Sequence, residues 1–407
     1  MSTDQRPRIA VVGGGIAGLT AAACLLRAGL RCTVFEQASA FADAGAGIQL
    51  APNSVRILHR LGLAEALDLR ATRATAIETR RWQDGGLLAR TELGTHCETA
   101  YGAPYYLIQR ADLHRSLLEL LPPDVVRHGA VCDSVVESDG GAVLHFRDGT
   151  AERADVVVAA DGIHSAIRGT LIDDGPRFSG HTVYRGLVPA DRLPGLFDEP
   201  KVVFWLGPGG HVTSYPIAGH KLVHFSAVTT SPGWNPAVWR AQARVEEAAA
   251  AFAGWGEEVR RLIDAADEVH HWALFDRPRT LSWNTDRIAL VGDAAHPMLP
   301  YLSQGANQAI EDAAVLAALL PAGGPAPAQA LGTYTALREP RAGEVHRRSR
   351  ERGLTFHFPD GPDQRSRDAA MPEAERLSAY GWLYGYDAET AAQALTSTGG
   401  HGGPEHG

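Results

Sequence analysis

The feature that most constrains the fold of this chain is a glycine-rich segment near the N-terminus, which runs from Gly13 to Gly18. A short apolar run, Ile9 to Val12, precedes it, and an alanine- and leucine-rich stretch that ends at Gly29 follows it. This order predicts a strand, a tight turn and a helix. Because Thr33 to Phe35 predicts a second strand, the chain is expected to begin with a βαβ unit of a parallel sheet.

Three glycines of this turn indicate that the unit binds a dinucleotide. Gly13 permits the tight turn, Gly15 lets the backbone approach a pyrophosphate, and Gly18 permits close packing of the helix. The N-terminus of the helix adds a positive dipole for the anion. Glu36 ends the second strand, where a carboxylate can accept hydrogen bonds from an adenosine ribose. The pattern alone leaves open whether the dinucleotide is NAD or FAD.

Two acids follow later strands of the same predicted sheet. Asp161 follows the apolar run Val156 to Ala160, and Asp293 follows the run Ile288 to Val291. Ligands of such sheets bind outside the carboxyl ends of the strands. We therefore expect both acids to reach the ligand that the glycine turn binds.

The middle and the end of the chain predict different structures. Thr182 to Val228 contains alternating segments separated by glycine and proline clusters, which favours a sheet of a separate substrate domain. A helix is predicted from Asn307 to Leu320, and another from about Ala328 to Arg352, interrupted or kinked at Pro340.

The remaining C-terminal segments are predicted to be mostly irregular. Phe358 to Met371 is expected to be an exposed connection, and Thr396 to Gly407 a disordered tail. The aromatic segment Tyr380 to Tyr386 is expected to pack either against the body of the protein or against a second subunit.

The composition of the chain excludes several classes of binding partner. The chain has 38 basic and 47 acidic residues, and its net charge of -9 is spread without long blocks of like charge, so the pattern of a nucleic-acid binder is missing. The four cysteines lack the paired spacing of zinc sites, and no metal site is predicted. No apolar run approaches the roughly 18 residues that span a bilayer. We expect a soluble, cytoplasmic protein without a membrane partner, working as a monomer or homodimer.

A series of motifs resembles the class A FAD-dependent aromatic hydroxylases, a family of flavoprotein monooxygenases, over roughly residues 8 to 350. Within the family, the chain is similar to the salicylate, 3-hydroxybenzoate and 6-hydroxynicotinate hydroxylases, which act on small hydroxylated aromatic acids. The motifs that carry the resemblance are Gly13 to Gly18 with Glu36, Gly45 to Gln49 before Pro52, Arg110 to Leu113, Asp161-Gly162, Gly292-Asp293 through Gly305 to Asn307, and Glu311 to Ala313.

The resemblance implies an α/β fold in which a Rossmann-like FAD-binding domain is interleaved with a β-sheet substrate domain, plus C-terminal helices. The FAD-binding domain is expected at residues 1–75, 105–180 and 278–320, and the substrate domain at 76–104 and 181–277. A C-terminal helical region is expected at 321–395, followed by the tail at 396–407.

The resemblance also implies the chemistry. NADH or NADPH would reduce FAD, molecular oxygen would form a C4a-hydroperoxide, and one oxygen atom would pass to a small electron-rich, phenolic acid-like aromatic substrate. The implied cofactor-binding residues are Gly13, Gly15, Ile16, Ala17, Gly18, Glu36, Gln37, Gly47, Arg110, Asp161, Gly292, Asp293, Pro300, Gly305, Ala306 and Asn307. Gln37 departs from the family pattern, because many relatives have Arg there.

His211 and Tyr215 are the predicted catalytic pair. Their even spacing on a predicted strand places both on one side of the sheet, where His211 can take a phenolic proton and Tyr215 can donate to a substrate oxygen. The pair also resembles His and Tyr positions of the hydroxybenzoate and hydroxynicotinate enzymes. Gln49, Arg185 and Tyr301 are predicted to contact the substrate, Arg185 by pairing with a carboxylate or with a mobile flavin.

Two other interpretations remain open from the sequence. The same chemistry, as hydroxylation or epoxidation, could act on a larger polyketide, indole or quinolone. A protein of another class, a noncatalytic flavin- or ligand-binding sensor or accessory protein, could retain the same motifs without turnover. The choice between NADH and NADPH is also open.

Overall fold

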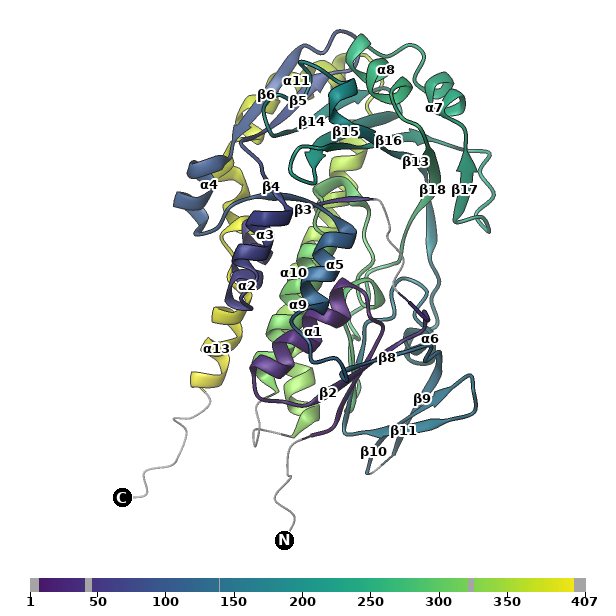
Figure 1. Cartoon of the computed structure of the whole chain (residues 1–407), viewed down its shortest axis with the longest axis vertical. Coiled ribbons are helices and arrows are strands. Elements are labelled where there is room, and N and C mark those ends of the chain that lie inside the picture. The colour runs from purple at the N-terminus through teal and green to yellow at the C-terminus, as the bar shows by residue number, and fades with distance from the viewer. Residues whose placement is uncertain (1–6, 41–45, 139, 321–325, 399–407) are drawn as a thin grey trace.

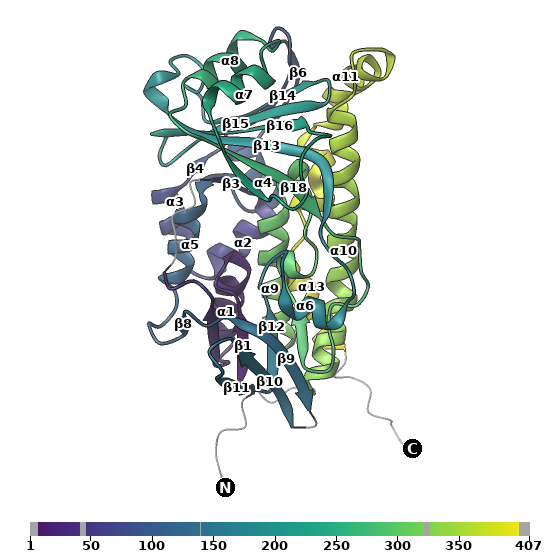
Figure 2. The same ribbon diagram turned by 90° about the vertical axis from the view of Figure 1, so that its right-hand side faces the viewer.

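The structure, a computed structural model, describes residues 7–40, 46–138, 140–320 and 326–398. Two sheets occupy opposite ends of an elongated molecule, and helices fill the space between and beside them (Figure 1). One long helix runs beside both layers (Figure 2).

The sheet that begins at the N-terminus has five parallel strands in the order β19-β12-β1-β2-β8. Strands β1, β12 and β19 are fully buried, as expected for a parallel sheet covered on both faces. Helices α1 (Ile16–Arg27) and α9 (Gly305–Leu319) pack against each other beside it. The strands are β1 (Ile9–Val12), β2 (Cys32–Glu36), β8 (Val126–His128), β12 (Val156–Ala159) and β19 (Ile288–Leu290).

The large sheet has eight strands in the order β17-β18-β13-β16-β15-β14-β5-β6. Every neighbouring pair is antiparallel except β14 and β5, which are parallel. The strands are β5 (Ala76–Arg81), β6 (Leu87–Glu92), β13 (Arg177–Pro189), β14 (Lys201–Gly207), β15 (Gly210–Ile217), β16 (Leu222–Thr230), β17 (Arg240–Ala243) and β18 (Val269–Asp276).

The two faces of the large sheet have different roles because side chains alternate along each strand. Val203, Trp205, Val212 and Phe225 belong to one apolar cluster with residues of helices α7 (Val245–Ala251) and α8 (Glu257–Asp264). The helices cover that face (Figure 1). The intervening residues of the same strands point to the opposite face, toward the parallel-sheet domain.

The chain also forms two three-stranded sheets and several short helices. They are sheet β3 (Gly47–Leu50), β7 (Tyr106–Gln109) and β4 (Thr72–Arg73); sheet β9 (Cys132–Ser138), β10 (Gly141–Phe146) and β11 (Ala151–Ala154); and helices α2 (Pro52–Arg60), α3 (Ala64–Arg70), α4 (Gly94–Tyr101), α5 (Arg110–Leu118) and α6 (Ala166–Leu171). Short 3-10 turns lie at Ala190–Arg192, Gly292–Ala294, Pro300–Leu302 and Leu377–Tyr380.

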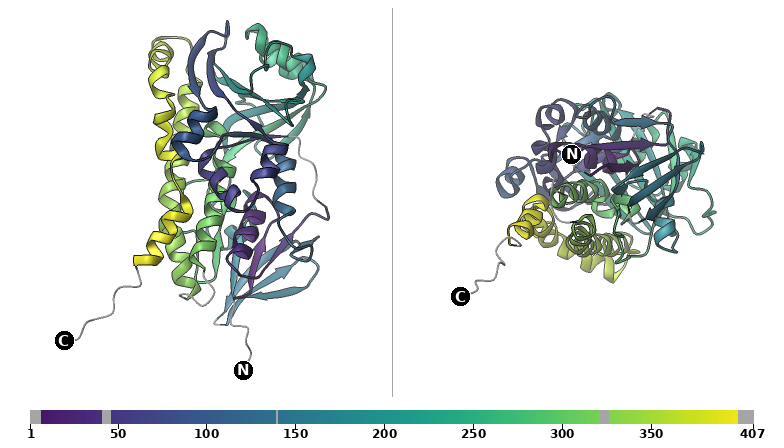
Figure 3. Two further views of the ribbon diagram at one scale, coloured as in Figure 1. Left: turned by 60° about the vertical axis from the view of Figure 1, so that its left-hand side comes forward. Right: turned by 90° about the horizontal axis from the view of Figure 1, so that it is seen from below.

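The C-terminal helices lie along one side of the molecule (yellow in Figure 3). Helix α10 (Pro327–Phe356) is continuous through Pro340, so the predicted interruption does not occur. Helix α11 (Pro362–Ala374) replaces the exposed connection predicted for this region. Its sequence gives a weak amphipathic signal, but Pro362 suits the first helical turn, and Met371 is buried in the core.

Helix α12 (Gly381–Tyr384) and helix α13 (Ala388–Thr398) complete the chain. The aromatic segment packs on the body of its own chain, where Tyr384 contacts Tyr101 and Tyr105 edge-on at centroid distances of 5.9 Å. Helix α13 extends to Thr398, into the segment predicted as a disordered tail. The rest of that prediction, residues 399–407, lies outside the described residues.

A fully buried charge cluster joins α10 to α9. The Arg338 guanidinium donates to Glu311 at 2.5 Å and to Asp312 at 2.8 Å, and all three side chains are inaccessible to solvent. Asp312 also accepts hydrogen bonds from the Gly292 backbone at 3.0 Å and shares one with His296 at 2.5 Å. Burial alone would raise the pKa of Asp312, but the neighbouring His296 and Arg338 lower it to about 2. The cluster therefore depends on its cation.

Replacing Arg338 by Met should lower the free energy of unfolding. The variant leaves two carboxylates buried without their common partner, which typically costs about 3–5 kcal/mol of unfolding free energy. Urea unfolding of the FAD-loaded protein, followed by circular dichroism, measures the loss. Arg347→Met on the exposed face of the same helix removes only solvent-screened pairs with Glu344 and Glu351, so it should change the midpoint little. Equal effects of the two variants would contradict this assignment.

Candidate functional site

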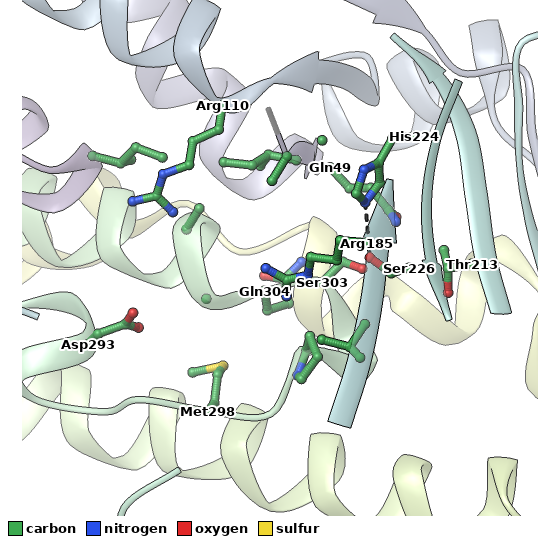
Figure 4. A pocket seen from close by; sticks show the side chains of 18 of the residues that line it. Gln49, Arg110, Arg185, Thr213, His224, Ser226, Asp293, Met298, Ser303 and Gln304 are labelled. Carbon is green, nitrogen blue, oxygen red and sulfur yellow. Dashed lines mark hydrogen bonds between the residues drawn. The ribbon is translucent and has the colours of Figure 1, made fainter. Parts of the chain in front are cut away.

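A cavity of about 350 Å³ lies between the carboxyl ends of the parallel strands and the open face of the large sheet. Arg110 and Asp293 project into one end of it, and Arg185, Thr213, His224 and Ser226 lie at the other end (Figure 4). One continuous space therefore connects the predicted dinucleotide site with the predicted substrate domain.

The glycine turn lines the first end of the cavity as its sequence predicts. Gly13 has φ +102°, and a Cβ atom there would lie 2.4 Å from the Ala160 carbonyl oxygen. A Cβ at Gly18 would lie 1.9 Å from the Gly13 carbonyl oxygen, so only glycine fits where the helix crosses the strand. Gly15, by contrast, has no atom within 4 Å of a Cβ position and borders the cavity. A pyrophosphate could approach this backbone closely.

Glu36 points at the glycine turn. Its carboxylate accepts hydrogen bonds from the Gly14 amide at 2.6 Å and from the Ala38 amide at 2.7 Å. These bonds fix the side chain at the end of β2, beside the turn where an adenosine ribose would lie. Gln37 is exposed and outside the cavity wall. The contacts of both residues with a cofactor stay predictions.

The two strand-end acids occupy different positions. Asp293 is set deep in the fold, yet its side chain is open to the cavity. The surrounding protein raises the pKa of its carboxyl, with His296 and Arg110 opposing, and solvent in the cavity weakens this shift. Asp161 lies behind the wall that Gly162 forms; its Oδ1 is buried without a hydrogen-bond partner in the described part of the chain, while Oδ2 accepts from the Ile167 amide at 3.4 Å.

The segment before α9 forms another part of the wall. Pro300, Gly305 and Ala306 line the cavity, as do Ile16, Ala17 and Gly47. Helix α9 begins at Gly305, two residues earlier than predicted, so its partial positive end faces the cavity. Gly292 lies in the turn next to Asp293, where its φ is +62°.

Asn307 has a different position from its neighbours. It is fully buried, its Oδ1 accepts hydrogen bonds from the Ala51 amide and the Ser54 hydroxyl at 2.8 and 2.5 Å, and its Nδ2 donates to the Gln49 carbonyl at 3.0 Å. Asn307 thus ties the segment after β3 to α9 and lies behind the cavity wall.

The register of the large sheet builds the other end of the cavity. Arg185 on β13 is paired with Ser226 on β16, which is paired with Thr213 on β15. The next row along β15 and β16 on the same face contains Tyr215 and His224. The row on the other side contains Val183, Val228 and His211, and every residue of these rows lines the cavity.

Burial controls the ionisation of the polar groups on this wall. It lowers the pKa of His211 well below its ordinary value, with nearby His357 and His181 acting in the same direction. It lowers the pKa of His224 to about 3, with Arg185 acting in the same direction. Burial raises the pKa of Tyr215, although the Arg185 cation opposes this. At neutral pH the wall therefore carries neutral imidazoles and a neutral phenol beside one cation.

The sequence predictions placed His211, Tyr215, Gln49 and Arg185 on this wall, and all four line the cavity. The Gln49 side chain also accepts a hydrogen bond from the Tyr105 hydroxyl at 2.7 Å. Tyr301 is buried behind the wall, with its ring 5.5 Å from that of His211 between centroids.

Sequence reasoning missed His224, Ser226 and Thr213. His224 donates to or accepts from the Ser226 hydroxyl at 3.0 Å, shown by the dashed line in Figure 4. The signal was available, because His224 and Ser226 are the polar alternate positions of an otherwise apolar strand. Met298 and Gln304 also border the space.

The cavity fits a flavin dinucleotide. Open space beside the Gly15 backbone suits a pyrophosphate, and the Arg110 side chain supplies a cation that can reach it. The cavity continues past the N-terminus of α9 to the polar wall of the second sheet, so a redox ring would meet a substrate there. This fold and site define an oxidoreductase that binds a dinucleotide cofactor next to a separate substrate sheet.

Comparison with known proteins specifies the family. The family described as FAD binding domain matches residues 6–349. The chain is 71% identical over 386 residues to a 3-amino-4-hydroxybenzoate 2-monooxygenase of Streptomyces platensis, covering 95% of this chain and 98% of the relative. It is 37% identical over 353 residues to a 6-hydroxynicotinate 3-monooxygenase of Pseudomonas fluorescens, covering 86% and 91%.

A solved salicylate hydroxylase substrate complex has the same fold, with a TM-score of 0.83 and 30% identity over 96% of this chain and 98% of that one. The chain therefore belongs to the FAD-binding family of class A flavoprotein hydroxylases. It is an FAD-dependent aromatic monooxygenase that uses NAD(P)H, and the resemblance seen in the sequence is confirmed.

The close approach of β3 to the polar wall gives a test of this site. A Cβ atom at Gly47 would lie 2.7 Å from the Tyr215 ring and 2.9 Å from the His224 ring. Gly47→Ala should therefore displace both rings and lower the NAD(P)H oxidation stimulated by small aromatic acids about tenfold or more, since overpacking costs about 1–3 kcal/mol. Gly332→Ala, where a Cβ meets open space, is the matched control. Unchanged turnover of the Gly47 variant with FAD bound would show that the two rings do not matter.

Proposed function

We propose that this monooxygenase hydroxylates a small aromatic acid with a phenolic hydroxyl, of the 3-amino-4-hydroxybenzoate type. The observation that carries the proposal is the buried, incompletely hydrogen-bonded side chain of Arg185. Its side chain is set deep in the protein, faces the cavity, and has a buried Nε without a hydrogen-bond partner among the described residues. Burial lowers the pKa of this guanidinium, and the neighbouring Arg110 acts in the same direction; among the described residues no carboxylate opposes them.

A buried cation without an anion is unfavourable unless a ligand completes the pair. A carboxylate suits this role because it can accept two parallel hydrogen bonds from a guanidinium. His211, Tyr215 and His224 lie on the same wall and can face the hydroxyl and amino groups of the ring. The chain's relative of 71% identity is named for 3-amino-4-hydroxybenzoate, which carries all three kinds of group.

The size of the cavity favours this substrate over a polyketide, indole or quinolone. Its volume of about 350 Å³ extends from Arg110 to Thr213, so a flavin must share it with the substrate.

Different residues of the chain would bind the substrate, accept its proton and stabilise negative charge. Bound flavin supplies the redox chemistry with oxygen. Arg185 would hold the substrate carboxylate, which orients the ring across the rows of the sheet. His211 would accept the phenolic proton, which makes the aromatic ring more electron-rich. Tyr215 would donate a hydrogen bond to a ring substituent and so help to orient the ring. The N-terminus of α9 would favour negative charge on the cofactor side of the cavity.

The proposal also covers the partners, the location and the oligomeric state of the enzyme. Its partners would be the aromatic acid, oxygen and NAD(P)H, with no nucleic acid, which the spread net charge of -9 supports. A reducing cytoplasm suits the four free cysteines, of which Cys24 and Cys97 are buried. Within the described segments no helix is long and apolar enough to cross a membrane. We propose a monomer or homodimer.

Substrate choice can be measured directly. The FAD-loaded enzyme should oxidise NADH or NADPH faster with 3-amino-4-hydroxybenzoate than with salicylate or 6-hydroxynicotinate, and should not respond to a bulky phenolic polyketide. Product analysis by mass spectrometry should show one added oxygen atom. Stimulation by the bulky phenol alone would replace the proposal with the larger-substrate alternative.

Arg185→Met tests the role of the guanidinium. Loss of a buried ion pair costs about 2–5 kcal/mol, so the Kd for 3-amino-4-hydroxybenzoate, read from the flavin spectrum, should rise about 30-fold or more. The Kd for 2-aminophenol, which lacks the carboxylate, should change far less. Arg177→Met removes an exposed arginine from the same strand and should leave both Kd values unchanged. A parallel loss for both ligands would exclude carboxylate binding by Arg185.

A further inference from the structure

A second cavity, of about 660 Å³, lies among the C-terminal helices. Side chains of α10 and α11 form much of its wall, together with residues between Glu375 and Trp382 and with Leu302. Leu302 ends the short turn Pro300–Leu302, and Pro300, at the start of that turn, lines the first cavity. The two cavities are therefore neighbours on either side of one turn.

Two phenylalanine rings meet between the cavities. Phe204, on β14, lines the first cavity, and Phe356, the last residue of α10, lines the second. Their ring centroids are 5.8 Å apart in an edge-to-face arrangement. Both side chains are buried, and both belong to an apolar cluster that also contains Met371 of α11. The pair of rings therefore forms a partition, with one ring facing each cavity.

Strand register places Phe204 at the end of a row of cavity residues. Phe204 is paired with Thr213, Thr213 with Ser226, and Ser226 with Arg185. Directly paired residues of neighbouring strands point to the same face of a sheet, so the row crosses four strands. Neighbouring strands lie about 4.8 Å apart, so three spacings separate the backbones of Arg185 and Phe204 by about 14 Å. The row begins at a guanidinium and ends at an apolar ring.

The partition is held in place from the C-terminal side. The Arg352 guanidinium lies over the Phe356 ring, 4.7 Å from its centroid, and Arg367 donates a hydrogen bond to the Phe356 carbonyl at 3.2 Å. The carbonyl of the next residue, His357, accepts a hydrogen bond from the Gly209 amide at 3.0 Å, which fastens the end of α10 to the turn before β15. Closely packed interiors resist displacement, so a ligand cannot push these rings aside without cost.

We propose that Phe204, backed by Phe356, sets the length of the aromatic acid that the enzyme accepts. The inference rests on the proposed function, because it takes the substrate carboxylate to be held by Arg185. With the carboxylate at that end of the row, the aromatic ring extends along the row toward Phe204. An acid whose long axis is longer must displace a packed ring, which is unfavourable in the same way as overpacking a core.

The second cavity gives this inference a distinctive consequence. Truncation of a buried ring usually leaves an isolated hole of the size of the missing atoms. Truncation of Phe204 instead lengthens the first cavity toward Phe356, and truncation of both rings joins it to the second cavity. Loss of the partition should therefore allow longer acids to bind.

Selectivity between a one-ring and a two-ring acid tests the role of Phe204. The Kd values of the FAD-loaded enzyme for 3-amino-4-hydroxybenzoate and for 6-hydroxy-2-naphthoate, whose fused ring lengthens the same axis, are read from the flavin spectrum. The unchanged protein should bind the naphthoate about 30-fold more weakly than the benzoate, within the range that overpacking produces. Phe204→Ala should lower the Kd for the naphthoate about tenfold or more and raise that for the benzoate less than about fivefold.

Further variants separate the partition from a general loss of packing. Phe204→Leu shortens the side chain only partly, so it should lower the naphthoate Kd about threefold, and it replaces the alanine variant if that protein does not fold. Phe356→Ala keeps Phe204 on the wall and should leave both Kd values within about twofold. The double variant Phe204→Ala, Phe356→Ala should bind the naphthoate more tightly than Phe204→Ala does. Phe358→Ala, at a position that lines the second cavity, is the matched control and should change neither Kd.

Each result decides between the possibilities. Equal Kd values for the two acids in the unchanged protein, or an unchanged ratio of the Kd values in both Phe204 variants, would overturn the inference and leave the proposed function standing. If neither acid perturbed the flavin spectrum of the unchanged protein, the proposed function would fail and the inference with it. Tighter binding of the naphthoate by the Phe204 variants, without such a gain in Phe358→Ala, would support the assignment of Phe204.

Discussion

The buried guanidinium of Arg338 is the interaction on which the cofactor side of the molecule depends. It joins α10 to α9 and pairs with Glu311 and Asp312, two buried carboxylates that Arg341 and His296 also stabilise. Through Asp312 the same cluster holds the Gly292 backbone, and through Glu311 it reaches Asn53, whose amide donates at 2.6 Å. The C-terminal helix α10 therefore supports the turn at Asp293 and helix α9, both of which border the cavity.

On the substrate side of the cavity, the positions of the side chains depend on strand register rather than on a balance of buried charges. Three neighbouring strands place Arg185, Ser226 and Thr213 in one row, with Tyr215 and His224 in the next row on one side and His211 in the next row on the other. Backbone pairing therefore fixes the positions of these groups. Arg185 differs from Arg338 because, within the segments that the structure describes, no carboxylate acts on its guanidinium. The Arg338 guanidinium is paired with carboxylates of the protein, and the Arg185 guanidinium faces the cavity.

Features that depend on residues close together in the sequence could be predicted, whereas features that depend on contacts between distant segments could not. The glycine turn and the strand of His211 and Tyr215 follow from local patterns, whereas the interleaved domains were implied by the family resemblance. Alternation could also have revealed His224. Nothing in the sequence around His357 indicates that it meets His211, because the contact depends on how the end of α10 docks on the large sheet. The docking of α11 and the position of Tyr301 behind the wall are tertiary outcomes of the same kind.

The interleaving of the two sheets has a consequence for how the protein is made. The edge strand β19 of the parallel sheet comes from Ile288–Leu290, and its neighbour β12 and central strand β1 come from much earlier. In the large sheet, β5 pairs with β14 across a long stretch of chain. Neither sheet can be completed while the ribosome is still translating the middle of the message, because each sheet includes pairings between segments far apart in sequence, such as β12 with β19 and β5 with β14. The emerging N-terminal half must wait with unpaired strand edges, which makes it a natural client for chaperones.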